Sequence, residues 1–225
     1  LSAGQGGKVD QNYLFEHFSP QKGLSQGSGY AIASYNNFMW FGTQDGLNRF
    51  DGYTYKVYRT GENQAIRDNF IQCLLADSRG RFWVGTVRGI DLYNKDRDDF
   101  VAVSKAFAIP ATHPVNNLAV RRLIEDREGM VWMMTDERGV YRFNPATGHI
   151  AGFLERDNSL VDITLAADGT VWITSDNDAY FYDAARACLQ PVNLKKTLGL
   201  PTATIFRAVV GDAEGNIWVG TYEQG

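Results

Sequence analysis

The side chains best suited to hold a metal are three histidines, His17, His113 and His149. They lie far apart in the chain, and neither an HExxH pattern nor paired CxxC spacing accompanies them. His113 is the best placed, in the loop-like stretch "ATHPVNN", although a solvated loop histidine is the simpler interpretation. We therefore expect no metal site.

Carboxylates are the other reactive groups present in number, with 26 Asp and Glu residues. Acid–base catalysis needs two of them at a defined separation, which spacing along a chain does not establish. The chain has no GxSxG, Walker or dinucleotide fingerprint. We expect no catalytic residues and no cofactor in these residues.

Tryptophan marks an internal repeat. Aligned segments begin at every tryptophan of the chain, and the separations run from 40 to 49 residues: "WFGTQDGLNRFD" at Trp40, "WVGTVRGIDLYN" at Trp83, "WMMTDERGVYRFN" at Trp132, "WITSDNDAYFYD" at Trp172 and "WVGTYEQG" at Trp218. Such a period is typical of stacked structural units.

A second shared element precedes the tryptophans. An apolar run reaches an aspartate, and a glycine follows three residues later, as in Asp77 and Gly80. Asp126 with Gly129 and Asp212 with Gly215 repeat the pattern, which predicts a hairpin turn. The fourth repeat is expected to be one or two residues shorter, ending at Asp168 and Gly169, and the first replaces the turn by "YNN" at 35–37.

Short aromatic and β-branched segments follow each tryptophan, such as "GLNRF" and then "YTYKVYR". Four strands per repeat predict an all-β fold, a β-propeller of four-stranded antiparallel blades. About five blades are present, in an incomplete ring, over residues 13–225, with a flexible tail at 1–12. We expect each tryptophan to fill the interface between neighbouring blades, and residues 13–18 to form a strand that completes a last blade.

The repeats "GNIWVGT", "GRFWVGT" and "FMWFGTQDGLNRFDG" resemble the regulator-propeller repeat of bacterial hybrid two-component regulators. The opening "YLFEHFSPQKGLSQGSGYAI" resembles the start of that sensor region. The resemblance implies a periplasmic sensor domain that recognises an oligosaccharide and signals to a histidine kinase outside this chain, in a dimeric receptor. The repeat is more distantly similar to that of streptogramin lyases, so a propeller lyase or hydrolase is one alternative and an interaction scaffold is another.

The order of strands in a blade indicates which face of the propeller is the better candidate for ligand binding. The loop between strands two and three and the segment joining two blades share one face, opposite the turns at the aspartates. On that face lie Arg88, Asp136, Glu137, His113 and Asn117. Three further polar residues each precede a turn aspartate by five positions and point into a channel or bond the neighbouring blade: Gln72, Arg121 and Arg207. These eight are the candidate ligand-binding residues.

Net charge and hydrophobicity limit the classes of partner that the chain can have. A net charge of −4 leaves no basic surplus for phosphate backbones, so we expect no nucleic-acid partner. No apolar run is long enough to cross a bilayer, and the first residues lack a signal-peptide pattern, which fits either a cytosolic or a trimmed protein. Cys73 and Cys188 sit in apolar stretches, and we interpret them as unpaired core residues.

Overall fold

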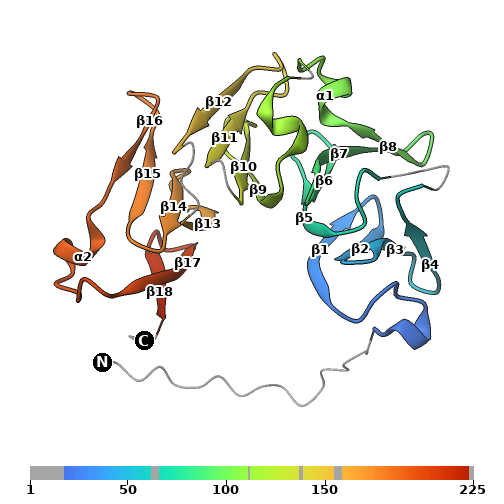
Figure 1. Cartoon of the computed structure of the whole chain (residues 1–225), viewed down its shortest axis with the longest axis horizontal. Coiled ribbons are helices and arrows are strands. Elements are labelled where there is room, and N and C mark those ends of the chain that lie inside the picture. The colour runs from blue at the N-terminus through green and yellow to red at the C-terminus, as the bar shows by residue number, and fades with distance from the viewer. Residues whose placement is uncertain (1–17, 62–65, 111, 137–138, 155–158, 223–225) are drawn as a thin grey trace.

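The repeats fold into five antiparallel sheets arranged in an arc, with the first strand of each sheet near the middle of the arc (Figure 1). This computed structural model describes residues 18–61, 66–110, 112–136, 139–154 and 159–222. Four sheets have four strands and the fifth has two, and we number them blades one to five in chain order. The predicted all-β propeller of four-stranded blades is confirmed.

The strands follow one another in each blade as a meander. Their bounds are β1 (Gly29–Tyr35), β2 (Phe38–Thr43), β3 (Gly46–Phe50) and β4 (Tyr55–Tyr58) in blade one; β5 (Ile71–Ala76), β6 (Phe82–Thr86), β7 (Gly89–Asn94) and β8 (Asp99–Ala102) in blade two; β9 (Val120–Glu125), β10 (Val131–Thr135), β11 (Val140–Phe143) and β12 (Ile150–Phe153) in blade three; β13 (Leu160–Leu165), β14 (Val171–Ser175), β15 (Ala179–Asp183) and β16 (Cys188–Pro191) in blade four; β17 (Ile205–Gly211) and β18 (Ile217–Tyr222) in blade five.

Short helical turns lie before the first strand and in the links between blades. They are the 3-10 helices η1 (Pro20–Lys22) and η2 (Pro114–Asn117) and the helices α1 (Val103–Ala106) and α2 (Leu194–Thr197). Among the described residues no helix is long and apolar enough to cross a membrane.

The turn aspartates do more than start a hairpin. In blade two the Asp77 carboxylate accepts hydrogen bonds from the backbone of Arg79 and Arg81 and from the Trp83 indole nitrogen, the last at 2.8 Å. Asp126 and Asp212 hold Trp132 and Trp218 in the same way, each at 2.8 Å. The six-residue spacing from aspartate to tryptophan therefore encodes a link between the turn and the interblade indole.

The fourth repeat corrects the expected turn length. Gly169 donates its backbone N–H to Ala166, and Ala166 donates to Thr170, the same pattern that Asp77 makes in blade two. Ala166 thus stands where the other blades have the turn aspartate, and the turn is not shortened. The first repeat is a tighter hairpin, as predicted, with Asn36 and Asn37 at φ 52° and 62°.

The tryptophans pack against the following blade, as expected. Trp40, Trp83 and Trp132 are fully buried, each in an apolar cluster that includes residues of the next blade. Trp172 is half-buried beside Phe206 of blade five. Trp218 differs, since 61% of it is exposed. Burial of the indole therefore follows from the presence of a neighbouring sheet.

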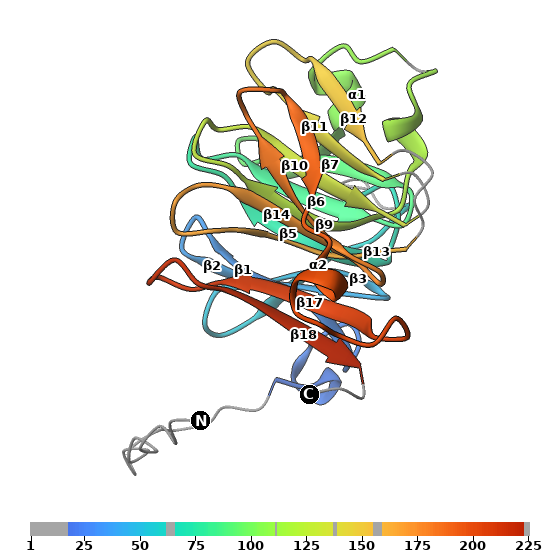
Figure 2. The same cartoon turned by 90° about the vertical axis from the view of Figure 1, so that its left-hand side faces the viewer.

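Inner strands of successive blades approach closely. A Cβ added at Gly85 in β6 would lie 2.3 Å from the Cys73 sulfur of the same blade and 3.2 Å from the Val120 carbonyl oxygen of blade three, so the glycine in "WVGT" lets β9 approach. Contacts between inner strands run in order from β1 to β5, β9, β13 and β17. Figure 2 shows the blades from the side, and blades one and five form the two ends of the arc in Figure 1.

Two further expectations concern the cysteines and the N-terminal strand. Cys73 and Cys188 are both free, Cys73 buried in β5 and Cys188 half-buried in the outer strand β16. Of the predicted strand at 13–18, only Phe18 is described, and its ring packs 5.2 Å from that of Phe41 in blade one. The remaining residues of that strand lie outside the described part of the chain.

Candidate functional site

Every inner strand carries a β-bulge at the same position. The pairing register between the first and second strands of each blade skips one residue, and the skipped residues are Tyr30, Gln72, Arg121, Val161 and Arg207. A bulge redirects its side chain out of the regular alternation of a strand. The structure therefore places the three polar residues chosen from the sequence, Gln72, Arg121 and Arg207, at one equivalent position.

A cavity of about 250 Å³ lies along this row in the first three blades. It is lined by three aligned bulge residues and two neighbours: Tyr30, Gln72, Arg121, Phe70 and Arg122. The Tyr30 and Phe70 rings meet edge to face at 4.9 Å and form its aromatic wall. The Gln44 amide donates to the Tyr30 hydroxyl at 2.6 Å and fixes the orientation of that ring.

Gln72 brings an unsatisfied polar group to the cavity. Its Oε1 atom is buried and has no hydrogen-bond partner among the described residues. A buried acceptor without a donor costs about 1 to 3 kcal/mol, so such groups usually meet a ligand or an ordered water. Gln72 is thus the side chain of the row best prepared to accept a hydrogen bond from a bound molecule.

Two arginines supply the charge of the cavity, and each is paired. The Arg121 guanidinium lies 3.1 Å from Asp136, which is in the loop after β10. Arg122 lies 3.1 Å from Asp162 on the inner strand of blade four. Both pairs are partly exposed, so they leave the arginines oriented but accessible. The wall therefore offers donors and acceptors of both signs rather than a single strong charge.

The other candidate residues are not brought to this cavity. Arg88 is largely exposed and lies 3.4 Å from Asp68 in the preceding link. His113 caps η2, where its Nδ1 accepts from the Val115 backbone at 3.3 Å. Asn117 is exposed at the end of η2, and Arg207 lies over the Tyr222 ring at 5.5 Å. Glu137 falls outside the described residues.

The loop residues nevertheless share one face, as the topology predicted. The Asp136 backbone N–H donates to Ala119 in the link before β9, at 3.1 Å. Asp176, in the equivalent loop of blade four, donates to Ser159 at 2.9 Å. Loops after second strands and links before first strands are therefore joined, and the aspartate turns lie at the other end of the strands.

The three histidines lie in different parts of the chain. His113 is occupied as a cap, His149 lies in the turn before β12, and His17 is outside the described residues. Within the described ranges, no three His, Cys, Asp or Glu residues form a group suited to hold a metal ion.

Sequence reasoning missed Tyr30, Phe70 and Arg122. Tyr30 was hidden because the first hairpin is shorter, so counting back from a turn aspartate is impossible there. Counting back from the residue paired with the tryptophan, Ala33 in β1 and Leu75 in β5, would have placed Tyr30 beside Gln72. Phe70 and Arg122 are sequence neighbours of bulge residues, and nothing in the repeat pattern distinguishes them.

Two segments match the sequence profile of a known repeat family. Residues 65–88 and 199–223 match the profile described as the two component regulator propeller. These two segments are therefore similar to the regulator-propeller repeat. The matched segments contain the inner strand, the aspartate turn and the tryptophan of blades two and five, so the family pattern and the structural repeat coincide.

Solved structures with the same fold include extracellular domains of B. thetaiotaomicron proteins. The extracellular domain named for the hybrid two component system BT3049 is 22% identical with a TM-score of 0.74, over 93% of this chain and 29% of that one. The corresponding domain of BT4673 is 24% identical with a TM-score of 0.70, over 85% and 26%. This chain thus spans between a quarter and a third of the length of those domains.

A propeller enzyme also shares the fold. Virginiamycin B lyase from Staphylococcus aureus is 16% identical with a TM-score of 0.63, over 87% of this chain and 67% of the lyase. At that identity the likeness concerns the fold alone. The search of curated proteins found no match to the chain.

Proposed function

We propose that this regulator propeller is a ligand-sensing domain on the extracytoplasmic side of a hybrid two-component system. The observation that carries the proposal is the row of bulge residues, which brings Tyr30, Gln72 and Arg121 of three successive blades to one cavity. The match of two segments to the two component regulator propeller and the similar fold of extracellular domains of hybrid two component systems support the assignment to a receptor.

The proposed ligand is a glycan fragment. The aromatic wall of Tyr30 and Phe70 offers an apolar surface to a sugar ring, and the open acceptor of Gln72 suits a hydroxyl donor. The Arg121–Asp136 pair adds a donor and an acceptor at the same rim. Uncharged polyhydroxy ligands fit such a wall better than strong anions, because each arginine already faces a carboxylate.

Signalling would pass to a histidine kinase in the receptor through a change in the arrangement of two subunits. A ligand shifts that arrangement only if it binds one state more tightly than the other. In this proposal the cavity reports occupancy, and the rest of the receptor, in the inner membrane and beyond, converts it into phosphorylation.

The test is a thermal-shift panel of oligosaccharides on this chain. A binding glycan at one hundred times its dissociation constant adds about 2.7 kcal/mol to the free energy of unfolding. Substituting Gln72→Ala or Arg121→Ala should remove that increment, while Arg97→Ala, on a distant turn, should keep it. If no oligosaccharide of a broad panel raises the melting temperature, the glycan proposal is contradicted and an interaction scaffold is favoured.

The lyase alternative rests on the shared fold and has its own test. Incubation with a streptogramin B antibiotic, followed by mass spectrometry, would show a ring-opened product if the chain were a lyase. We expect unchanged antibiotic, because the Nδ1 atom of His113 accepts a hydrogen bond from the Val115 backbone and caps η2.

A further inference from the structure

Blades one and two meet around a single carboxylate. Asp98, in the turn before β8, accepts hydrogen bonds from four side chains of the interface: Arg49 at 2.8 Å, Lys56 at 2.5 Å, Tyr58 at 2.6 Å and Tyr93 at 2.6 Å. Burial alone would raise the pKa of Asp98, but the bonds from Lys56 and the two tyrosines outweigh it and lower the pKa to about 2. The carboxylate is therefore ionised and fully engaged.

The interface of blades three and four is built from equivalent positions. Arg142 pairs with Trp132 across β10 and β11 as Arg49 pairs with Trp40 across β2 and β3. On the facing blade, Tyr182 follows the residue paired with Trp172 as Tyr93 follows the residue paired with Trp83. An arginine and a tyrosine thus recur at both interfaces.

The partner carboxylate does not recur. The turns before β8 and β16 have the same length and the same left-handed residue, Asp98 at φ 54° and Ala187 at φ 51°. Ala187 therefore stands in place of Asp98. The register of the fourth strands also puts Ala151 in place of Lys56 and Phe153 in place of Tyr58. The charged side chains of Lys56 and Asp98 are thus replaced by methyl groups.

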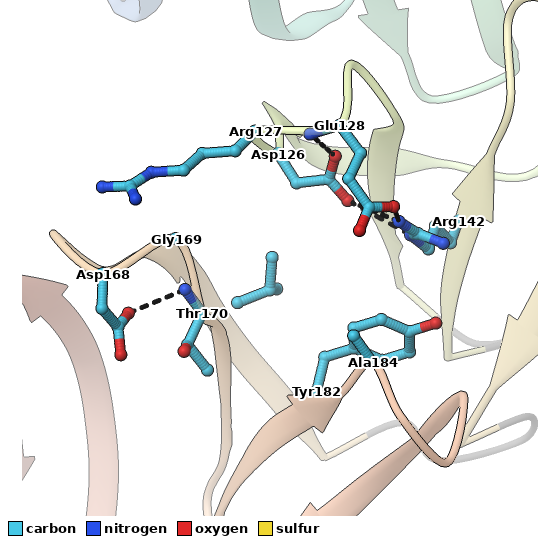
Figure 3. Close-up of a pocket in the computed structure, with 10 residues that line it drawn as sticks. Asp126, Arg127, Glu128, Arg142, Asp168, Gly169, Thr170, Tyr182 and Ala184 are labelled. Atoms are coloured by element: carbon cyan, nitrogen blue, oxygen red, sulfur yellow. Dashed lines mark hydrogen bonds and ion pairs between the residues drawn. The ribbon is translucent and has the colours of Figure 1, made fainter.

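A cavity of about 590 Å³ occupies the position of the missing side chains. Its lining includes the substituted positions and the retained pair: Ala151, Phe153, Ala187, Met130, Arg142 and Tyr182. A second cavity of about 270 Å³, drawn in Figure 3, shares Glu128, Arg142 and Tyr182 with the first. The retained arginine and tyrosine thus line both hollows.

Donors remain available on this shared wall. The Arg142 Nε and Nη2 atoms bond Asp126 and Glu128, as the dashed lines in Figure 3 show. In the described part of the chain, no partner is bound to Arg142 Nη1 or to the Tyr182 hydroxyl, the groups whose counterparts in Arg49 and Tyr93 hold Asp98. The guanidinium lies 5.0 Å from the Tyr182 ring centre, which keeps both groups in place.

We propose that this cavity binds a small ligand with one carboxylate on a six-membered ring, and that the ligand carboxylate takes the position held by the Asp98 carboxylate between blades one and two. Arg142 and the Tyr182 hydroxyl donate to the carboxylate. The ring lies against Met130 and Phe153, in space that Lys56 and Asp98 fill at the other interface. Aromatic acids and uronic acids share this chemistry.

The charges of the site limit the ligand to a single negative charge. Asp126 is occupied by the Trp132 indole and by backbone donors, but Glu128 is 62% exposed and faces the ligand side of Arg142. Glu128 therefore competes with a ligand carboxylate for the guanidinium. Dianions such as phosphate meet two fixed carboxylates and are disfavoured.

Calorimetric titration of the chain with sodium benzoate and with sodium glucuronate tests the proposal. At least one of the two acids should bind, and benzamide or glucose, the matched neutral compounds, should bind at least about tenfold more weakly, a difference of about 1.4 kcal/mol. Stronger binding of glucuronate identifies a sugar acid as the source of the carboxylate, and stronger binding of benzoate identifies an aromatic acid.

Variants locate the binding. Ala187→Asp introduces the missing carboxylate and should weaken acid binding at least about tenfold, whereas Glu128→Gln removes the competitor and should strengthen it about threefold. Tyr182→Phe removes only the hydroxyl and should weaken binding about fivefold. Arg97→Ala, an exposed arginine on the blade-two turn, should leave it unchanged.

Three results would overturn the proposal: no heat from either acid, equal affinity for acids and neutral compounds, or unchanged affinity in Tyr182→Phe and Glu128→Gln. The last pair keeps the test valid even if Ala187→Asp does not fold. Glycan binding is proposed for the Gln72 cavity and acid binding for the cavity between blades three and four. A negative result for one cavity therefore does not affect the proposal for the other.

Discussion

The interfaces between blades one and two and between blades three and four share a framework and differ in their polar groups. In both, a fully buried tryptophan packs against the next blade beside an arginine that covers aromatic rings. In the first, Asp98 joins four donors. In the second, Ala187 stands at that position and a cavity of about 590 Å³ remains. Two interfaces can therefore share the same apolar contact at the tryptophan while differing farther out. We call the interface of blades one and two closed, because Asp98 fills it, and that of blades three and four open, because it contains the cavity.

This difference shows that the residues that stabilise a blade interface are not the residues that could bind a ligand there. Apolar burial at the indole holds neighbouring blades together wherever a next blade is present. The polar positions farther out along the third and fourth strands vary without disturbing that contact. A binding site between blades can thus arise at the outer positions without loss of the apolar contact, while the inner bulge residues line a separate cavity at the middle of the arc.

The largest effect should come from removing the shared framework. Trp40→Ala and Trp132→Ala should each lower the free energy of unfolding by about 4 kcal/mol, because both indoles are fully buried. Trp218→Ala should cost well under about 1 kcal/mol, since 61% of that side chain is exposed. Urea denaturation measures all three. Unequal costs for Trp40 and Trp132 would show that the two interfaces do not share a framework.

A smaller loss should follow from opening the closed interface. Asp98→Ala removes the acceptor of two cations and two hydroxyls and should cost about 2 to 3 kcal/mol. The control Arg186→Ala removes a side chain that is 71% exposed and pairs with Asp183, and it should cost about 0.5 kcal/mol. Equal losses in the two variants would mean that the Asp98 network does not hold the blades.

The closed interface should also weaken in acid. The pKa of Asp98 is lowered to about 2, so its stabilising contribution is complete above the unfolded pKa near about 4 and is lost as pH falls through about 2. The difference in unfolding free energy between wild type and Asp98→Asn should therefore be constant from pH about 5 upward and shrink below pH about 4. A difference that persists undiminished at pH about 2 would contradict the assignment.

The smallest effect should come from closing the open interface. Ala187→Asp should raise the free energy of unfolding by about 1 kcal/mol, because it restores bonds to Arg142 and Tyr182 against the repulsion of Glu128. Ala187→Asn relieves the left-handed backbone at φ 51° without the charge and should give less than half of that gain. Equal gains from Asp and Asn would show that the backbone, and not the carboxylate, is responsible.

Much of the fold was predictable because the repeat contains residues, such as the turn glycines, whose backbone geometry is restricted. Gly80 and Gly129 adopt φ 74° at the ends of their turns, as the spacing from Asp77 and Asp126 predicted. The hydrogen bond from each aspartate to its tryptophan was not predicted. The fourth turn was predicted to be shorter and to end at Asp168 and Gly169, because Ala166 stands where the other turns have an aspartate. A turn recognised by its side chain is lost when the side chain changes, although the backbone pattern persists.

The sites were less predictable for a different reason. Gln72 and Arg121 were found because they recur at one position, and the bulge explains why that position matters. The cavity between blades three and four exists because Ala151 and Ala187 have small side chains. An alanine in a sequence does not by itself indicate a binding site. Only alignment of complete blades, with Asp98 as the reference, shows that something is replaced there.

The most direct test of this account is a crystal structure of the chain soaked with benzoate or glucuronate. Superposition of blades three and four on blades one and two should place the ligand carboxylate on that of Asp98, within hydrogen-bonding distance of Arg142 and the Tyr182 hydroxyl. An empty interblade cavity, or a carboxylate bound elsewhere such as beside Arg121, would contradict it.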